Sequence, residues 1–278
     1  MPSRDFRQWL APRLERAAAL MNDDNPIWVD GPLHLGIDLG TSDIVSMVLD
    51  ADDNPVAVCL DWADVVRDGV VWDYFGAVNL VRSQMARLQD RLGRRIEEAN
   101  TSYPPGTDRR ISVNVIEAAG LRVAQVIDEP SAVASLLGIE RAAVVDIGGG
   151  TTGIAVVHDG RVVYSGDEPT GGHHVSLTLA GNRRISLEQA EQIKREEGSA
   201  VWPTVQPVFE KMCDIVRQHL AGQEVAELYL SGGSCALPGV ADLFASEFPD
   251  ITIFLPSQPL FLTPLSIAAF RGAMNGSP

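Results

Sequence analysis

Short apolar segments separated by turn residues predict two similar groups of three strands. In each group a tight, glycine-containing turn joins the first two strands, and a second polar turn leads to the third. The first group covers residues 33–39, 44–49 and 56–60, and the second covers residues 143–147, 154–157 and 162–164. An aspartate, Asp38 or Asp146, ends the first strand of each group, and the two lie 108 positions apart (146 − 38). This repeat indicates a duplicated α/β unit with a ligand cleft between its halves.

Helical periodicity fills most of the sequence between and after these strands. Helices are predicted over residues 74–98, 111–119, 131–137 and 186–197. Ser186 and Gln189 have the spacing of a capping box, and Gly198 is expected to end the helix that they begin.

The first 30 residues are distinct and predict an amphipathic helix followed by a linker. Pro12 suits the first turn of a helix, and the polar cluster from Asn22 to Pro26 predicts its end. One face of this helix is apolar at 3.6-residue spacing and contains Leu14, Ala17, Ala18 and Met21. The helix either packs on the body of the protein or docks on a partner. Its alanine-rich face favours packing.

Composition and charge narrow the classes of function. The chain has 278 residues, of which 45% are hydrophobic and 21% charged, as expected for a globular protein with a sizeable core. The net charge of −15 argues against general binding to nucleic acid or anionic membranes, because both are polyanions. Three scattered cysteines indicate neither a disulfide framework nor a zinc or iron–sulfur site. The sequence contains no apolar run that could span a membrane and no secretory signal, so we expect a cytoplasmic protein.

The turns after Asp38 and Asp146 have the composition of phosphate-binding loops. Glycine permits positive φ angles and close approach of the backbone to a ligand, and successive N–H groups in such turns form a concave anion site. Thr41 and Thr151 add hydroxyl donors, and the two aspartates suit a hydrated Mg²⁺. Either motif alone could be an ordinary β-hairpin. Their duplication favours a site that holds a nucleoside triphosphate from both sides.

Four segments resemble, in order and spacing, the motifs of the actin, sugar-kinase and heat-shock-chaperone ATPase superfamily. They are the first phosphate motif at 38–41, the connecting motif at 128–134, the second phosphate motif at 146–152 and the adenosine motif at 231–234. The resemblance implies an α/β, actin-like ATPase fold, which is a duplicated ribonuclease-H-like fold. Two lobes would surround a nucleotide cleft, with reduced insert subdomains. The resemblance divides the chain into a helix and linker (1–30), lobe I (31–140), lobe II (141–260) and a C-terminal helix that returns toward lobe I (261–278).

The resemblance also implies a site for ATP or ADP with Mg²⁺. Asp38 and Asp146 would bind the metal through water, and Glu129 would lie near it and position water. The implied catalytic residues are Glu129, Asp146 and Thr151. The implied phosphate-binding residues are Asp38, Gly40, Thr41, Gly148, Gly149, Gly150 and Thr151.

Further residues are implied in placing the nucleotide. Gly171 and Gly172 would bring a helix N-terminus to the phosphates, where the helix dipole favours anions. Glu191 and Lys194, three apart on one helix, match the pair that holds ribose and adenine in DnaK-type chaperones, although a solvated salt bridge is the alternative. Gly232 and Gly233 belong to the adenosine motif. For His173 and His174, a place at the helix start is preferred to metal binding.

Two departures from the DnaK pattern bear on hydrolysis. DnaK-type chaperones have a catalytic lysine in the first lobe, whereas the two lysines of this chain are Lys194 and Lys211. The acidic side chain that follows the second phosphate motif in DnaK and MreB is replaced by Gly153. We therefore expect nucleotide binding with slow hydrolysis at most. A DnaK-type peptide-binding domain is not expected.

Nearly the whole chain resembles the EutJ family of bacterial ethanolamine-utilisation proteins, most closely over residues 56–76, 101–107 and 170–194. The resemblance implies a nucleotide-binding, chaperone-like factor that assists assembly, protection or reactivation of ethanolamine ammonia-lyase or of its bacterial microcompartment. The implied partners are the lyase and the microcompartment shell proteins, in the cytoplasm or at the microcompartment. One alternative is a nucleotide-gated scaffold or adaptor without chaperone activity, as in MreB, FtsA or PilM. A small-molecule kinase is another, for which the short insertions leave little room.

Overall fold

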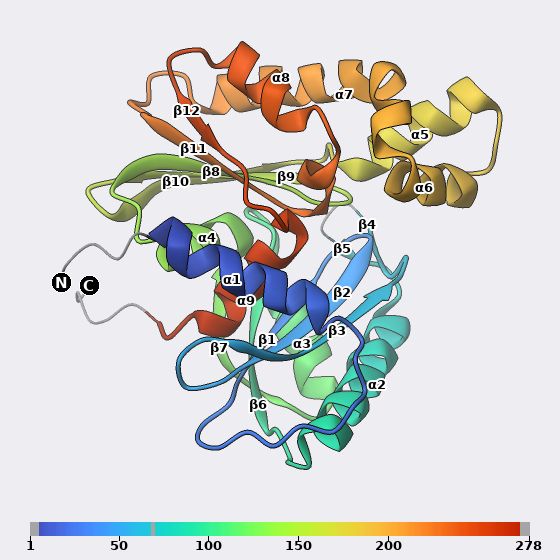
Figure 1. Ribbon diagram of the computed structural model, residues 1–278, viewed down its shortest axis with the longest axis vertical. Coiled ribbons are helices and arrows are strands. Elements are labelled where there is room, and N and C mark those ends of the chain that lie inside the picture. Colours follow the sequence, from blue (N-terminus) through green and yellow to red (C-terminus); the bar gives the residue numbers. More distant parts are fainter. Residues whose placement is uncertain (1–5, 68–69, 273–278) are drawn as a thin grey trace.

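Two five-stranded sheets of the same design form the two lobes of the computed structural model, which describes residues 6–67 and 70–272 (Figure 1). Lobe I has the strand order β3-β2-β1-β6-β7 and lobe II the order β10-β9-β8-β11-β12. In each sheet three antiparallel strands are extended by two parallel ones. The matching topology confirms the predicted duplication and the mixed α/β architecture.

The strands of the two predicted groups, which are β1 to β3 in lobe I and β8 to β10 in lobe II, begin and end close to the predicted positions. Lobe I contains β1 (His34–Leu39), β2 (Asp43–Leu49), β3 (Pro55–Trp62), β6 (Glu98–Tyr103) and β7 (Arg122–Asp128). Lobe II contains β8 (Arg141–Ile147), β9 (Thr152–His158), β10 (Arg161–Glu168), β11 (Glu227–Ser231) and β12 (Thr252–Phe254). A short hairpin, β4 (Val66–Arg67) and β5 (Val70–Val71), extends lobe I. Strands β8 and β9 are buried along almost their whole length because helices cover both faces of the sheet.

Helices form three layers around these sheets (Figure 1). Helices α2 (Tyr74–Leu92) and α3 (Arg110–Ala118) cover the outer face of lobe I. Lobe II is covered by α5 (Gly172–Arg183), α6 (Leu187–Glu196), α7 (Gly198–His219) and α8 (Val240–Glu247). Between the sheets lie α1 (Phe6–Ala19), α4 (Glu129–Leu137), α9 (Leu262–Ala269) and the short η2 (Pro259–Phe261), in a core that both lobes share. No helix in the described ranges combines the length and apolar character that a membrane span requires.

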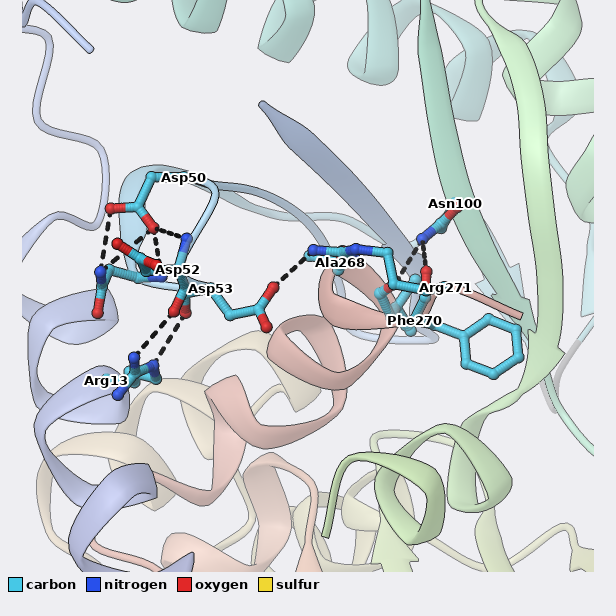
Figure 2. A network of polar contacts seen from close by, with 10 residues as sticks. Arg13, Asp50, Asp52, Asp53, Asn100, Ala268, Phe270 and Arg271 are labelled. Carbon is cyan, nitrogen blue, oxygen red and sulfur yellow. Dashed lines mark hydrogen bonds and ion pairs between the residues drawn. The ribbon is translucent and has the colours of Figure 1, made fainter. Parts of the chain in front are cut away.

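The prediction of one helix over 74–98 was wrong at its end. Gly93 takes the left-handed conformation at φ 58° and caps α2, and strand β6 starts five residues later at Glu98. This strand escaped prediction because its buried positions are polar. Asn100, for example, donates to the carbonyls of Ile267 (2.9 Å) and Phe270 (2.7 Å) instead of packing an apolar side chain (Figure 2).

Two helix boundaries also differ from their predictions. Pro12 lies inside α1 and not in its first turn, since the helix already includes Phe6. Gly198 does not end the helix that begins at the Ser186 capping box. The cap is Glu197, and Gly198 starts α7 directly afterwards. The capping box itself is present as predicted.

Helix α1 packs on the body of the protein, as its alanine-rich face indicated. Leu10, Leu14 and Ala17 are fully buried in the core between the lobes. Arg13 donates to the carbonyls of Asp52 (2.9 Å) and Asp53 (3.1 Å) in the turn between β2 and β3 (Figure 2).

The C-terminal segment reaches the same turn, because Arg271 pairs with the Asp53 carboxylate at 2.6 Å (Figure 2). Just before it, α9 lies against β1 so closely that a Cβ on Gly36 would overlap the backbone of Ala268. Both ends of the described chain are thus fixed to lobe I on either side of one turn.

Candidate nucleotide-binding site

A cavity of about 840 Å³ opens between the lobes, within the usual size range of small-ligand sites. The chain turns that follow β1 and β8 line it from opposite sides. Most of the predicted site residues line it: Asp38, Gly40, Thr41, Glu129, Asp146, Gly148, Gly149, Gly150, Thr151, Glu191, Lys194, Gly232 and Gly233. Gly171 and Gly172 are placed behind the second loop and do not line the cavity.

The glycines of the second loop allow it to touch the first. A Cβ on Gly149 would overlap the Ser42 hydroxyl, and a Cβ on Gly150 would lie 2.5 Å from the Thr41 hydroxyl oxygen. Neither glycine has a positive φ angle. Close approach of the two loops is what excludes a side chain. Gly232, in contrast, does have a positive φ, of 89°.

Asp38 and Asp146 occupy equivalent positions on the two lobes, and each accepts a hydrogen bond from a hydroxyl group. Ser102 donates to Asp38 at 3.0 Å, and Thr263 of α9 donates to Asp146 at 2.5 Å. Burial raises the pKa of both carboxyls, that of Asp38 to about 7 with a further contribution from the negative charge of Asp146. Two uncompensated carboxylates at the base of the cleft are suited to a hydrated divalent cation.

Glu129 is the first residue of α4, directly after the N-cap residue Asp128. Burial raises its pKa well above the ordinary value, and the charges of Asp38 and Asp146 add to the effect. The structure therefore brings the three acidic residues of the predicted site to one place. Thr151, the other predicted catalytic residue, is buried at the end of the second loop.

The N-terminus of α5 supports the second loop and does not face the cavity. The N–H groups of Gly172 and His173 donate to the carbonyls of Gly148 (2.9 Å) and Gly149 (2.7 Å). These two donors are thus occupied, which differs from the expectation that they meet the phosphates directly. His174 has the helix-start position that was preferred for it, since its Nδ1 accepts from the N–H of Gly171 at 3.4 Å.

Glu191 and Lys194 form a partly buried ion pair at the cavity wall, with Nζ to Oε2 2.8 Å apart. The Ser176 hydroxyl also donates to Glu191, and Lys194 donates to the carbonyl of Gly172 at 3.0 Å. Although burial opposes ionisation of Glu191, its pKa is lowered, chiefly by the positive charge of Lys194. The pair therefore joins α6 to α5 at the side of the cleft, and it is not the fully solvated salt bridge of the alternative interpretation.

Sequence reasoning missed a contact across the mouth of the cleft. The guanidinium group of Arg195 in lobe II lies 4.1 Å from the ring centre of Trp62 in lobe I, and both residues line the cavity. Asp43 lies near the same guanidinium. Burial raises the pKa of Asp43 to about 6, and the positive charge of Arg195 partly opposes this rise. Arg195 directly follows Lys194 on α6, which is a signal that could have identified it.

The cavity wall is acidic overall. Among the described residues that line it, the basic side chains are Lys194 and Arg195, and the acidic ones are Asp38, Asp43, Glu129, Asp146, Glu191, Glu196 and Glu197. A bare triphosphate would be repelled by this wall. A divalent cation that enters with the phosphates would reduce that repulsion.

Comparison with known families and structures gives the same fold. The family described as "Cell division protein FtsA" matches residues 143–266. Two crystal structures of MreB5 of Spiroplasma citri are each 17% identical to this chain. The AMPPNP-bound form has a TM-score of 0.68 and covers 86% of this chain and 95% of its own. The ADP-bound form has a TM-score of 0.67 and covers 84% of this chain and 94% of its own.

Closer relatives cover almost the whole chain. The ethanolamine utilization protein EutJ of Escherichia coli K12 is 62% identical over 262 residues, which are 94% of this chain and 94% of that protein. The crystal structure of EutJ from Carboxydothermus hydrogenoformans, 40% identical, has a TM-score of 0.89 and covers 95% of this chain and 99% of its own. The chain, with its duplicated actin-like fold, therefore belongs to the EutJ family of ethanolamine-utilisation proteins.

Proposed function

We propose that the chain binds ATP or ADP with Mg²⁺ between its lobes and acts as a chaperone-like factor in ethanolamine utilisation. The observation that carries the proposal is the cleft itself. Two duplicated loops and two equivalent aspartates, Asp38 and Asp146, meet at one cavity. The MreB5 structures bound to AMPPNP and ADP, which share the fold, support a nucleotide as the ligand.

The residues of the cleft fit a magnesium nucleotide. Asp38 and Asp146 would hold Mg²⁺ through its water molecules, and a bound Mg²⁺ neutralises phosphate charge. Thr41 and the backbone of the second loop would bind phosphate oxygens. Glu129 would orient a water molecule near the phosphates, and Lys194 with Glu191 would bind the sugar and base.

Hydrolysis is expected to be slow. The sequence contains no lysine before Lys194, and both basic side chains among the described residues that line the cavity, Lys194 and Arg195, come from lobe II. Lobe I would then supply no cation to stabilise charge on the transferred phosphoryl group. The function would then rest on the difference between nucleotide-bound and free forms. A partner that prefers one of these forms shifts the equilibrium between them.

The proposed partners are ethanolamine ammonia-lyase and the shell proteins of its microcompartment, with a location in the cytoplasm or at the microcompartment. Support comes from membership of the EutJ family. A pull-down of the lyase with and without ATP tests this part of the proposal. Sedimentation with ATP and Mg²⁺ tests the scaffold alternative, in which the protein would form polymers.

Nucleotide binding is tested by calorimetric titration of ATP and ADP in the presence of Mg²⁺. We expect binding by the natural protein and a loss of affinity of at least ~tenfold in Asp146→Ala, because a metal-binding carboxylate is removed. The matched control is Asp108→Ala, which removes an exposed carboxylate paired with Arg110 outside the cleft. Unchanged affinity in Asp146→Ala would remove the central claim.

A further inference from the structure

Asp167, on strand β10, is a half-buried carboxylate that the site described above does not include. Its cross-strand partner in the register of β9 and β10 is Gly153. A Cβ built on Gly153 would lie 3.6 Å from Oδ1 of Asp167 and 3.3 Å from the ring of Pro130. The carboxyl group of Asp167 thus lies beside the space that residue 153 leaves without a side chain.

The surroundings of Asp167 connect it with the phosphate end of the cleft. The Thr151 side chain hydrogen-bonds to its carboxyl, and Thr151 itself lines the cavity. The negative charge of Asp167 acts on Glu129, and that of Asp146 acts on Asp167. Asp167 itself does not line the cavity, but it lies behind Thr151 and interacts electrostatically with two acidic residues that do, Glu129 and Asp146.

One oxygen of Asp167 has no partner within the described part of the chain. Its Oδ1 is inaccessible to solvent and makes no hydrogen bond. A buried acceptor without a donor is destabilising, so native structures rarely keep one without a ligand or a bound water to satisfy it. The neighbouring carboxyls of Glu129 and Asp146 favour a ligand that brings both positive charge and O–H donors.

From this geometry we propose that Asp167 is a third carboxylate of the cation site, binding the hydration shell of the divalent metal together with Asp38 and Asp146. It supplies from β10 the acidic side chain that Gly153 does not provide on β9. The inference rests on the proposed magnesium-nucleotide function and identifies a further residue of the same site. Asp167 acts through metal-bound water, because Mg²⁺ usually keeps several water molecules when proteins bind it.

The experiment compares ADP affinity, measured by calorimetry, in Mg²⁺ and in EDTA. The natural protein should bind ADP more tightly with Mg²⁺. Asp167→Asn, which keeps the size of the side chain, should reduce this Mg²⁺-dependent gain by about tenfold, the smaller end of the effect of removing an outer-shell ligand. Affinity for ADP in EDTA should stay within about twofold of that of the natural protein, because the proposed role of Asp167 depends on the metal. A group that only supports the loop would instead lower the affinities in Mg²⁺ and in EDTA alike.

Two further variants separate metal binding from loop support. Asp167→Ala combined with Gly153→Asp moves the carboxylate to the neighbouring strand and should recover the Mg²⁺ effect that Asp167→Ala alone loses. The matched control is Glu168→Gln. This next carboxylate on β10 is paired with His219 at 3.0 Å and should leave the Mg²⁺ effect unchanged. An unchanged Mg²⁺ effect in Asp167→Asn, or equal losses in Mg²⁺ and EDTA, would overturn the proposal.

Binding of Mn²⁺ without nucleotide, followed by electron paramagnetic resonance, distinguishes this inference from the nucleotide function. Mn²⁺ binding by the natural protein that Asp167→Asn weakens supports the role of Asp167, even if ADP does not bind. ADP binding with equal Mn²⁺ affinity in both proteins overturns the role of Asp167 and leaves the nucleotide function standing. If neither Mn²⁺ nor ADP binds, both are wrong.

Discussion

The buried carboxyls of the cleft should make the stability of the ligand-free protein fall as pH rises. Burial raises the pKa of Asp38 from 3.8 to about 7. Between these values the folded protein binds a proton that the unfolded chain has released, so the free energy of unfolding decreases with increasing pH. One group shifted in this way contributes ~3 kcal/mol between pH 5 and pH 8. Asp43, raised to about 6, and Asp167, raised to about 7, act in the same direction.

Urea denaturation in EDTA at pH 5, 6, 7 and 8 measures this effect. The natural protein should lose ~3 kcal/mol or more across the range, and Asp38→Asn should lose distinctly less, because it has no proton to release there. The matched control is Asp108→Asn. A hydrogen bond from Arg110 lowers the pKa of Asp108 to about 2, so this group does not titrate in the range and the slope should be unchanged. Stability that is constant or rises from pH 5 to pH 8 would refute the reasoning, as would an unaltered slope in Asp38→Asn.

Three further predictions concern packing and loop contact. Leu14→Ala should lower the free energy of unfolding by ~3 kcal/mol in urea denaturation, since the side chain is fully buried, and a loss below ~1 kcal/mol would show that α1 is not part of the core. Addition of ADP with Mg²⁺ should change tryptophan emission through Trp62 at the cleft mouth. Trp62→Phe should remove most of the change and Trp28→Phe, at an 80% exposed position outside the cavity lining, should retain it; the opposite result would contradict the assignment. Gly149→Ala should weaken ADP binding by about tenfold, ~1.4 kcal/mol, as its methyl group displaces Ser42, and Ser42→Gly should restore affinity in the double variant; unaltered binding in Gly149→Ala would contradict the role of the loop contact.

The parts of the fold that the sequence predicted are those with a local signature. Each lobe begins with apolar strands and an aspartate before a glycine turn, so the duplicated sheets and the loops at Asp38 and Asp146 could be predicted from short stretches. Strand β6 could not, because its buried Asn100 is satisfied by backbone carbonyls almost 170 residues away and shows no apolar pattern. Hydrogen bonds of this kind form only when the chain is folded.

The same limit applies to the site. Contacts between residues close in the sequence, such as the pair Glu191 and Lys194, could be predicted from their spacing on a helix. Contacts across the cleft or across the sheet could not be predicted in this way. The meeting of Trp62 with Arg195, and of Asp167 with the space at Gly153, depends on strand register and on how the two lobes face each other.

The contact between the two loops has a consequence for the kinetics of ligand exchange. Ser42 touches Gly149, so a phosphate group placed between the loop tips requires them to separate first. Association would then pass through an opened form, and its observed rate would level off with increasing ligand concentration at the rate of opening. A nucleotide that has entered would in turn leave slowly, because the same loops must part again. Residence time, more than affinity, would therefore set how long a partner meets the nucleotide-bound form.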